Sequence, residues 1–312
     1  MEIVWLVIVG LLLAGWSGLD GFSLGAGMFL SRLKGDAPAR RRVVAAVGPF
    51  FLANEVWLIA FAGVLAVTFP EAKAGLFISL YPVLVLMIAA WLVRDAGMWF
   101  RARRPEARWQ ARWETTQAVA SVVFAAATGL FLGSAVQTPG DGLLWLLNPY
   151  ALLCGLAVTA LFALHGTAFL ALRTTGELRE RARHTAGRLA PVVVVLLLAL
   201  IGTAPLVTAT GVTPIAFVLG LVGPVAAAVA WLGVRRGGDG LTFASTAVAA
   251  VFLPLTVGAL MAERLLDGVA GQGAIDQLTL LAMPILPFLL VAQAVLWWVN
   301  RHRLNERSVT FF

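Results

Sequence analysis

Long apolar runs alternate with short segments rich in charged residues, Gly or Pro along nearly the whole chain. An α-helix needs roughly 20 apolar residues to cross a bilayer core. The pattern predicts an all-α integral membrane protein, with residues 1–312 forming a single polytopic domain of about nine spanning helices. The predicted spans are 4–30, 43–69, 75–93, 115–136, 146–172, 191–209, 213–234, 242–262 and 277–299.

Composition agrees with this pattern. Hydrophobic residues make up 60% of the chain, charged residues 12%, and the mean hydropathy is +0.90. Soluble domains carry about 25% charged residues and cannot bury this much apolar surface. The first span begins with Glu2 and lacks the basic start of a secretory signal, so we expect it to be retained as a membrane helix.

Basic residues fall almost entirely on one side of the predicted helices. Of the 23 Lys and Arg residues, 21 lie in the tail or in the segments after the first, third, fifth and seventh spans; only Lys73 and Arg264 lie on the other side. The positive-inside rule then predicts an N-terminus outside and a C-terminus in the cytoplasm. The net charge of +7 is explained by anchoring to lipid head groups, with no nucleic-acid partner.

Three ionisable residues lie deep inside predicted spans: Asp20, Glu55 and His165. A charged group in the bilayer costs a few kcal/mol, so each is a functional candidate. From the helical rise, they lie roughly 16, 18 and 10 Å from the basic end. One hypothesis is a shared polar cluster that carries protons from the cytoplasm. The alternatives are carboxylates satisfied by the backbone or Asn54, and a packed, hydrogen-bonded histidine.

Small residues accompany the first of these carboxylates. Gly21 and Gly25 are four residues apart, on one face of the first span, next to Asp20. This spacing lets a neighbouring helix approach closely, which predicts a tightly packed polar interface.

Other kinds of site are missing from the sequence. The single cysteine, Cys154, lies in an apolar run, so neither a disulfide framework nor a Cys metal cluster is expected. Phosphate-binding loops and nucleophile elbows are absent, and no metal site is predicted. With one intramembrane histidine, the chain alone has poor means to hold several haems.

Several short motifs occur in a characteristic order. They are Leu19-Asp20-Gly21-Phe22-Ser23-Leu24-Gly25-Ala26-Gly27, then Pro49 with Asn54-Glu55-Val56-Trp57-Leu58-Ile59, then Leu147-Asn148-Pro149-Tyr150, His165-Gly166-Thr167-Ala168, Arg173-Thr174-Thr175-Gly176-Glu177-Leu178 and Gln277-Leu278-Thr279-Leu280. In this order the set resembles subunit II of cytochrome bd-type quinol oxidases. The resemblance covers roughly residues 1–190 and 276–300; between them only the hydropathy matches.

The resemblance implies a subunit of a quinol:oxygen oxidoreductase in the bacterial cytoplasmic membrane. Members span the membrane nine times, which we expect here as two four-helix bundles plus one peripheral helix. They pair with a haem-bearing subunit I, which holds the b and d haems, oxidises quinol and reduces oxygen to water. Subunit II binds no haem in the best-known members, and a small single-span third subunit and membrane lipid are further expected partners.

By motif position, the resemblance also suggests roles for single residues. Trp57 corresponds to a tryptophan lining the oxygen route, and Asp20 and Glu55 take polar positions at or near the proton path. Two departures from the family pattern bear on that path. Ser23 stands where the family commonly has a second Asp, and Leu52 replaces an Asp found in some members. Glu55, three residues further along the same helix face, is placed to take over from position 52.

Two other functions remain open at this stage. A secondary transporter would use Asp20, Glu55 and His165 to couple ion and substrate movement, and prolines do interrupt the later spans. Matching inverted repeats are not visible, however. A purely structural assembly subunit is the third possibility, which the missing acid at position 52 supports.

Overall fold

The computed structural model describes residues 1–137, 143–208 and 211–305. The predicted end of the sixth span at residue 209, and Thr210 beyond it, lie outside these ranges. Helices dominate the described part of the chain. The α-helices are α1 (Glu2–Phe29), α2 (Ala37–Val47), α3 (Phe51–Thr68), α4 (Pro70–Ser79), α5 (Tyr81–Arg101), α6 (Ala107–Ala135), α7 (Pro149–Arg173), α8 (Gly176–Thr203), α9 (Pro214–Arg235), α10 (Asp239–Leu266), α11 (Gln272–Ala282) and α12 (Ile285–Val299).

Nine helical stretches in the described ranges are long and apolar enough to cross a membrane, which confirms the predicted number. Local sequence explains where several of them begin. Asn148 caps α7 by accepting a hydrogen bond from the Ala151 amide at 2.8 Å, and Thr213 caps α9 in the same way at 3.2 Å. In both, a proline follows the cap, where its fixed φ suits the first helical turn.

Three predicted spans differ from the helices. The second divides into α2 and α3 around Gly48-Pro49, where Pro49 has no N–H to continue the helical hydrogen bonds. The ninth divides into α11 and α12 at Met283-Pro284. The third, predicted as 75–93, forms α5 over Tyr81–Arg101, while the separate helix α4 occupies much of its expected start. The charge at Arg94 was wrongly taken as the end of that span.

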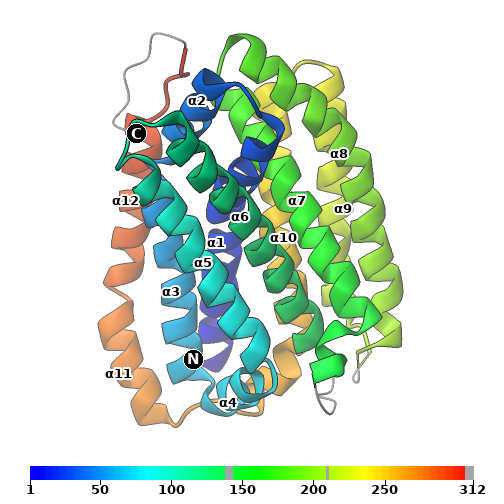
Figure 1. Cartoon of the computed structure of the whole chain (residues 1–312). Helices are drawn as coiled ribbons and strands as arrows, with labels where there is room; N and C mark the ends of the chain where they lie inside the picture. The colour runs from blue at the N-terminus through cyan, green and yellow to red at the C-terminus, as the bar shows by residue number, and fades with distance from the viewer. Residues whose placement is uncertain (138–142, 209–210, 306–312) are drawn as a thin grey trace.

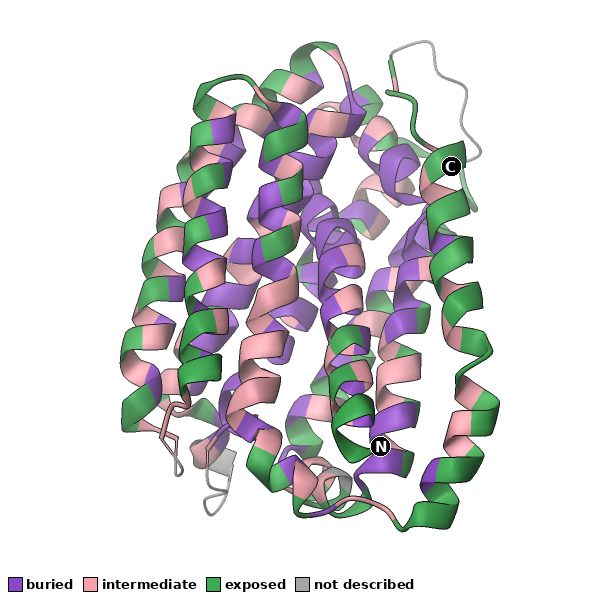
Figure 2. Cartoon of the chain, turned by 180° about the vertical axis from the view of Figure 1, so that it is seen from behind, coloured by how far each residue is buried: buried purple, intermediate pink, exposed green. Residues whose placement is uncertain are grey.

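Helix α1 lies at the centre of the molecule. It packs against α3, α6, α7 and α10, and these neighbours largely surround it (Figure 1). Helices α11 and α12 lie at the periphery and are mostly exposed (Figure 2). Only Ile275 of α11 and Gln293 of α12 are buried.

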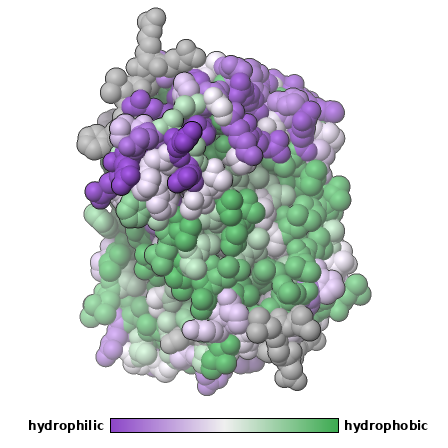
Figure 3. Space-filling model, viewed as in Figure 1, coloured by the Kyte–Doolittle hydropathy of each residue, from purple (hydrophilic) through white to green (hydrophobic). Residues whose placement is uncertain are grey.

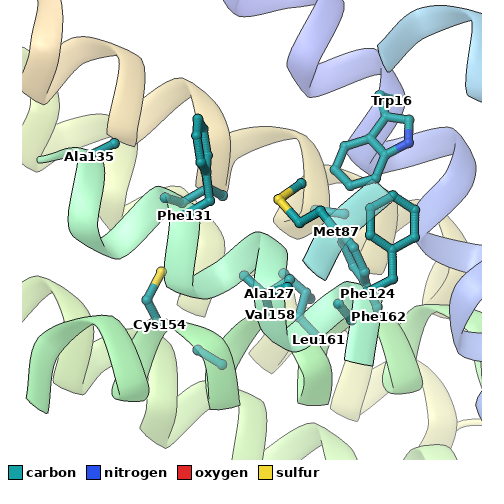
Figure 4. Packing of buried hydrophobic residues seen from close by; sticks show 14 of the residues in the cluster. Trp16, Met87, Phe124, Ala127, Phe131, Ala135, Cys154, Val158, Leu161 and Phe162 are labelled. Atoms are coloured by element: carbon teal, nitrogen blue, oxygen red, sulfur yellow. The ribbon is translucent and has the colours of Figure 1, made fainter. Parts of the chain in front are cut away.

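Aromatic and aliphatic side chains fill the space around α1. The Trp16 ring lies 5.7 Å from that of Phe124 and 6.0 Å from that of Phe162, which joins α1 to α6 and α7 (Figure 4). On the outside, a band of apolar residues crosses the middle of the visible face, and hydrophilic residues gather at the end that carries α2 (Figure 3). The band is the surface expected to face lipid.

Candidate functional site

A buried arginine joins two of the predicted carboxylates. Arg94 of α5 is 3% exposed, and its Nη1 donates to Asp20 Oδ2 at 2.8 Å. Its Nη2 donates to Glu55 Oε1, so one guanidinium connects α1, α3 and α5. Its Nε donates to Asp95 Oδ1 at 3.0 Å. These four residues are called the Arg94 cluster below.

The cluster contains more acids than bases. Three carboxyl groups surround one guanidinium, and Asp20 is fully buried while Glu55 is 5% exposed. The Oδ1 atom of Asp20 has no hydrogen-bond partner among the described residues. Buried charges are stable only when paired and hydrogen-bonded. One of the three carboxyl groups can therefore be protonated while the others pair with Arg94.

A second buried acid lies two helical turns nearer the arginine-rich end. Glu114 of α6 is 3% exposed, and its Oε1 accepts from Arg101 Nε at 2.7 Å. Its Oε2 lies 3.0 Å from Arg40 Nε. Arg94 and Arg101 are seven residues apart on α5 and so share one face, about 10 Å apart along the axis.

Buried polar atoms also occur between these two groups. Gln117 of α6 is 3% exposed, and its Nε2 lies 2.8 Å from the Met98 sulfur. Its Oε1 has no partner among the described residues. Gly97 of α5 packs on Gln117, since a Cβ at Gly97 would come within 2.9 Å of the Gln117 Cβ. Gln117 therefore lies on the α5–α6 interface between Glu114 and the Arg94 cluster, and this series of buried polar residues is called the polar track below; within the described residues no hydrogen bond joins Gln117 to either group.

Asn54 was expected as a hydrogen-bond partner of the carboxylates, but it bonds to other groups. Its Nδ2 donates to the Leu19 carbonyl at 2.7 Å and to Ser23 Oγ at 3.1 Å. Its Oδ1 accepts from Gln293 Nε2 at 2.9 Å. Asn54 thus links α1, α3 and α12, while the carboxylates of Asp20 and Glu55 bond to Arg94.

His165 of α7 uses its ring nitrogens elsewhere. Nε2 lies 2.9 Å from the Gly18 carbonyl, and Nδ1 lies 2.8 Å from Thr246 Oγ1. Since a carbonyl can only accept, Nε2 carries a proton. The Thr246 hydroxyl also lies 2.9 Å from the Phe243 carbonyl, so its one hydrogen has two acceptors within reach, Nδ1 and that carbonyl. The ring stacks on Phe243 with centroids 4.9 Å apart. These bonds connect His165 to α1 and α10, and no bond joins it to the Arg94 cluster in the described residues.

Trp57 and the two glycines lie at the helix contacts of α1. Trp57 is 8% exposed and its indole lies against Gly15, where an added Cβ would collide with the ring. Gly21 faces α7, since a Cβ there would be 2.9 Å from the Phe162 ring. Gly25 lies against the Phe162 carbonyl and Gly166, so the backbones of α1 and α7 approach closely.

Sequence reasoning missed Arg94 and Glu114, because both were assigned to a cytoplasmic loop. The usable signal was the seven-residue spacing of Arg94 and Arg101, which puts both on one helix face if the helix continues past residue 93. No group of three His, Cys, Asp or Glu residues able to hold an ion occurs in the described ranges.

Comparison with known proteins identifies the family. The family model for cytochrome bd terminal oxidase subunit II matches residues 1–300. The chain belongs to this family. The resemblance seen in the motifs is therefore confirmed.

Named relatives of the subunit II family agree. Cytochrome bd-I ubiquinol oxidase subunit 2 of Escherichia coli (strain K12) is 30% identical over 214 residues, which cover 65% of this chain and 56% of that protein. The chain thus aligns with little more than half of that relative. Cytochrome bd ubiquinol oxidase subunit 2 of Bacillus subtilis (strain 168) is 27% identical, with 98% of this chain and 97% of that protein covered.

A solved structure has the same fold. A chain from the structure of bd oxidase from Geobacillus thermodenitrificans matches with a TM-score of 0.76 and 14% identity, over 96% of this chain and 98% of that one. With the nine apolar helices and the bacterial subunit II relatives, this points to a multi-pass bacterial membrane protein.

Proposed function

We propose that this chain is the haem-free subunit of a quinol:oxygen oxidoreductase in the bacterial cytoplasmic membrane. In this proposal it pairs with a haem-bearing subunit I, which oxidises quinol and reduces oxygen to water. Membership in the subunit II family is the observation that carries the proposal. The relatives in Escherichia coli and Bacillus subtilis are named ubiquinol oxidase subunits, and a transporter has no comparable support.

The b and d haems belong to the partner subunit in this proposal. His165 is the intramembrane histidine, and both of its ring nitrogens already make hydrogen bonds, to Gly18 and Thr246. Iron could coordinate this ring only by replacing one of those bonds. His165 therefore fits a structural role linking α1, α7 and α10 better than a haem ligand.

The proposed orientation has the arginine-rich end in the cytoplasm, the N-terminus outside and the C-terminus inside. Most of the Arg residues lie in α2, at the ends of α5, α7 and α9, or in the first turns of α6 and α8, at one end of the helices. Cytoplasmic loops carry an excess of Lys and Arg. The proposed grouping is a single polytopic domain in which α1, α3, α5 and α6 form one bundle and α7–α10 a second. Helices α11 and α12 form the peripheral span.

We assign the proton path to the polar track between α5 and α6. Protons would enter near Glu114 at the cytoplasmic end and reach Asp20 and Glu55 in the Arg94 cluster. Three carboxyl groups around one guanidinium would carry two uncompensated negative charges if all were ionised. Since unpaired charge is unfavourable at low dielectric, a proton held on one carboxyl stabilises the cluster. Arg94 orients the two acids, and His165 has no part in this path.

The oxygen route is assigned to the apolar contacts around Trp57. Its indole lies against Gly15 of α1 and is nearly buried. Replacing it would change the space between α1 and α3 without removing a charge.

Purification tests the overall proposal. The chain carries an affinity tag and is extracted from its native membrane in mild detergent. We expect it to co-purify with a membrane protein whose spectrum shows b- and d-type haem bands, and quinol to support oxygen consumption. A monodisperse, haem-free preparation that transports a solute in liposomes would contradict the proposal.

A further inference from the structure

A polar cavity of about 320 Å³ lies at the end of the molecule opposite the arginine-rich segments. It lies between α4, the end of α6 and the end of α10; α4 marks this end in Figure 1. Among the side chains that the structure describes, its charged lining residues are Glu71, Arg264 and Asp267, which are one cation and two carboxylates. Charges of both signs in one cavity suit a ligand that also carries both signs.

Backbone carbonyls hold Arg264 in place, and Glu71 lies beside the turn after α10. Arg264 Nη1 donates to the Ala135 carbonyl at 3.1 Å and to the Gln137 carbonyl at 3.2 Å. These two bonds fix the guanidinium at the cavity wall. Because a guanidinium has five N–H donors and remains protonated, it keeps its positive charge and has further donors for a ligand. Glu71 lies against the turn that follows α10, since a Cβ at Gly268 would be 3.5 Å from Glu71 Oε2. Its carboxylate therefore lies next to the turn that carries Asp267.

A buried hydroxyl in the cavity wall lacks a partner. Ser134 is 1% exposed and lines the cavity, and its Oγ makes no hydrogen bond within the described ranges. Most buried polar atoms in proteins are hydrogen-bonded, and leaving one unpaired is unfavourable. The unpaired Oγ indicates a polar group inside the cavity.

An apolar cavity adjoins the polar one. It has a volume of about 490 Å³ and lies between α1, α3, α6, α9 and α10. Leu76, Ala135, Met261 and Leu265 line both cavities, so the two share a wall. Apolar side chains, glycines and a proline make up the lining of the second cavity. Together the cavities match a molecule with a polar head and an apolar chain.

We propose that the paired cavities bind one phospholipid with an amine head group. Its ammonium lies between Glu71 and Asp267, its phosphate accepts from Arg264 and Ser134, and an acyl chain occupies the apolar cavity. An anionic lipid without the amine would pair its phosphate with Arg264 but would place no cation between Glu71 and Asp267, so both carboxylates would repel it. Charge complementarity thus favours the zwitterion.

Lipid rebinding to the membrane-extracted complex tests the proposal. The complex is delipidated in detergent and titrated with phosphatidylethanolamine or phosphatidylglycerol of identical acyl chains, and bound lipid is counted by native mass spectrometry. We expect phosphatidylethanolamine to bind about tenfold more tightly, since charge-assisted hydrogen bonds account for such a difference. Glu71→Gln with Asp267→Asn should remove this preference. Glu263→Gln, an exposed change in α10 outside the cavity lining, should keep it.

Several results would overturn the proposal. They are equal binding of the two lipids, a preference that survives loss of both carboxylates, or a quinone retained in place of phospholipid. Ser134→Ala is a small second variant that keeps the helix intact and should weaken binding of both lipids through the phosphate. Since the readout is bound lipid and not oxygen turnover, failure here leaves the proposed oxidase function untouched.

Discussion

Arg94 is the residue on which the buried charges of α1, α3 and α5 depend. It bonds to Asp20, Glu55 and Asp95 while itself 3% exposed. Removing one member of a buried ion pair leaves an uncompensated charge, which costs about 3–5 kcal/mol. Arg94→Gln should therefore lower the thermal unfolding temperature of the purified complex and its yield. Arg236→Gln, an exposed change at the end of α9, should alter neither.

Two further variants separate charge from geometry at Arg94. Arg94→Lys keeps the charge but lacks the planar fork that reaches three carboxyl groups, so we expect intermediate stability. Adding Asp20→Asn and Glu55→Gln to Arg94→Gln removes the unpaired charges and should restore part of the loss. A triple variant less stable than Arg94→Gln would argue against electrostatic pairing as the cause.

Trp57 offers a test of the oxygen route. Trp57→Phe keeps an aromatic ring but alters the space against Gly15. If oxygen passes here, the KM for oxygen should change severalfold while the KM for quinol stays constant. If Trp57 only packs, both constants stay the same and only stability falls, by less than the about 3–5 kcal/mol expected for Trp→Ala.

At the residue scale, the sequence predicted that Asp20 and Glu55 lie deep inside the membrane spans, but it did not predict that Arg94 is the partner of both carboxylates. The third span was ended before Arg94 and the fourth was begun after Glu114, so both residues were assigned to a loop. An arginine inside a helix cannot be told from one at its end unless its partners on other helices are known. His165 was grouped with the acids by depth alone, whereas its face of α7 points to Thr246 and Gly18.

At the scale of the helices, the close contact of α1 with α7 requires a glycine at position 25. At Gly25 a Cβ would collide with the Phe162 carbonyl, whose backbone cannot move aside. Overpacking of this kind typically costs about 1–3 kcal/mol, so Gly25→Ala should lower the unfolding temperature and the amount of assembled complex. Gly63→Ala is the matched control, because a Cβ there meets nothing within 4 Å. Equal stability of the two variants would show that α1 and α7 can separate freely.

Helix boundaries were predicted well where a change in hydropathy coincides with a helix-capping residue followed by proline. Asn148-Pro149 and Thr213-Pro214 open α7 and α9 close to the predicted starts. Hydropathy could not find the breaks at Gly48-Pro49 and Met283-Pro284, because apolar side chains continue through both. It also could not separate α4 from α5, whose apolar residues are contiguous with only Leu80 between the helices.

At the scale of the whole molecule, orientation can be tested by cysteine labelling. Cys154 is buried, so background labelling should be low. Gly273 and Arg236 are exposed at opposite ends of the helices, and a Cβ at Gly273 meets nothing within 4 Å. We expect a membrane-impermeant maleimide to label Gly273→Cys in intact cells and Arg236→Cys only after permeabilisation. The reverse pattern would invert the proposed topology.

The account as a whole depends on protons reaching the Arg94 cluster from the arginine-rich end. The most direct measurement is proton uptake and oxygen consumption by the reconstituted complex carrying Asp20→Asn or Glu55→Gln, normalised to haem. Glu177→Gln, an exposed change in α8, is the control. We predict that at least one cluster variant lowers both rates about tenfold, which corresponds to about 1.4 kcal/mol, with haem content unchanged. Unchanged rates in both variants would contradict the proton path and leave the cluster a structural one.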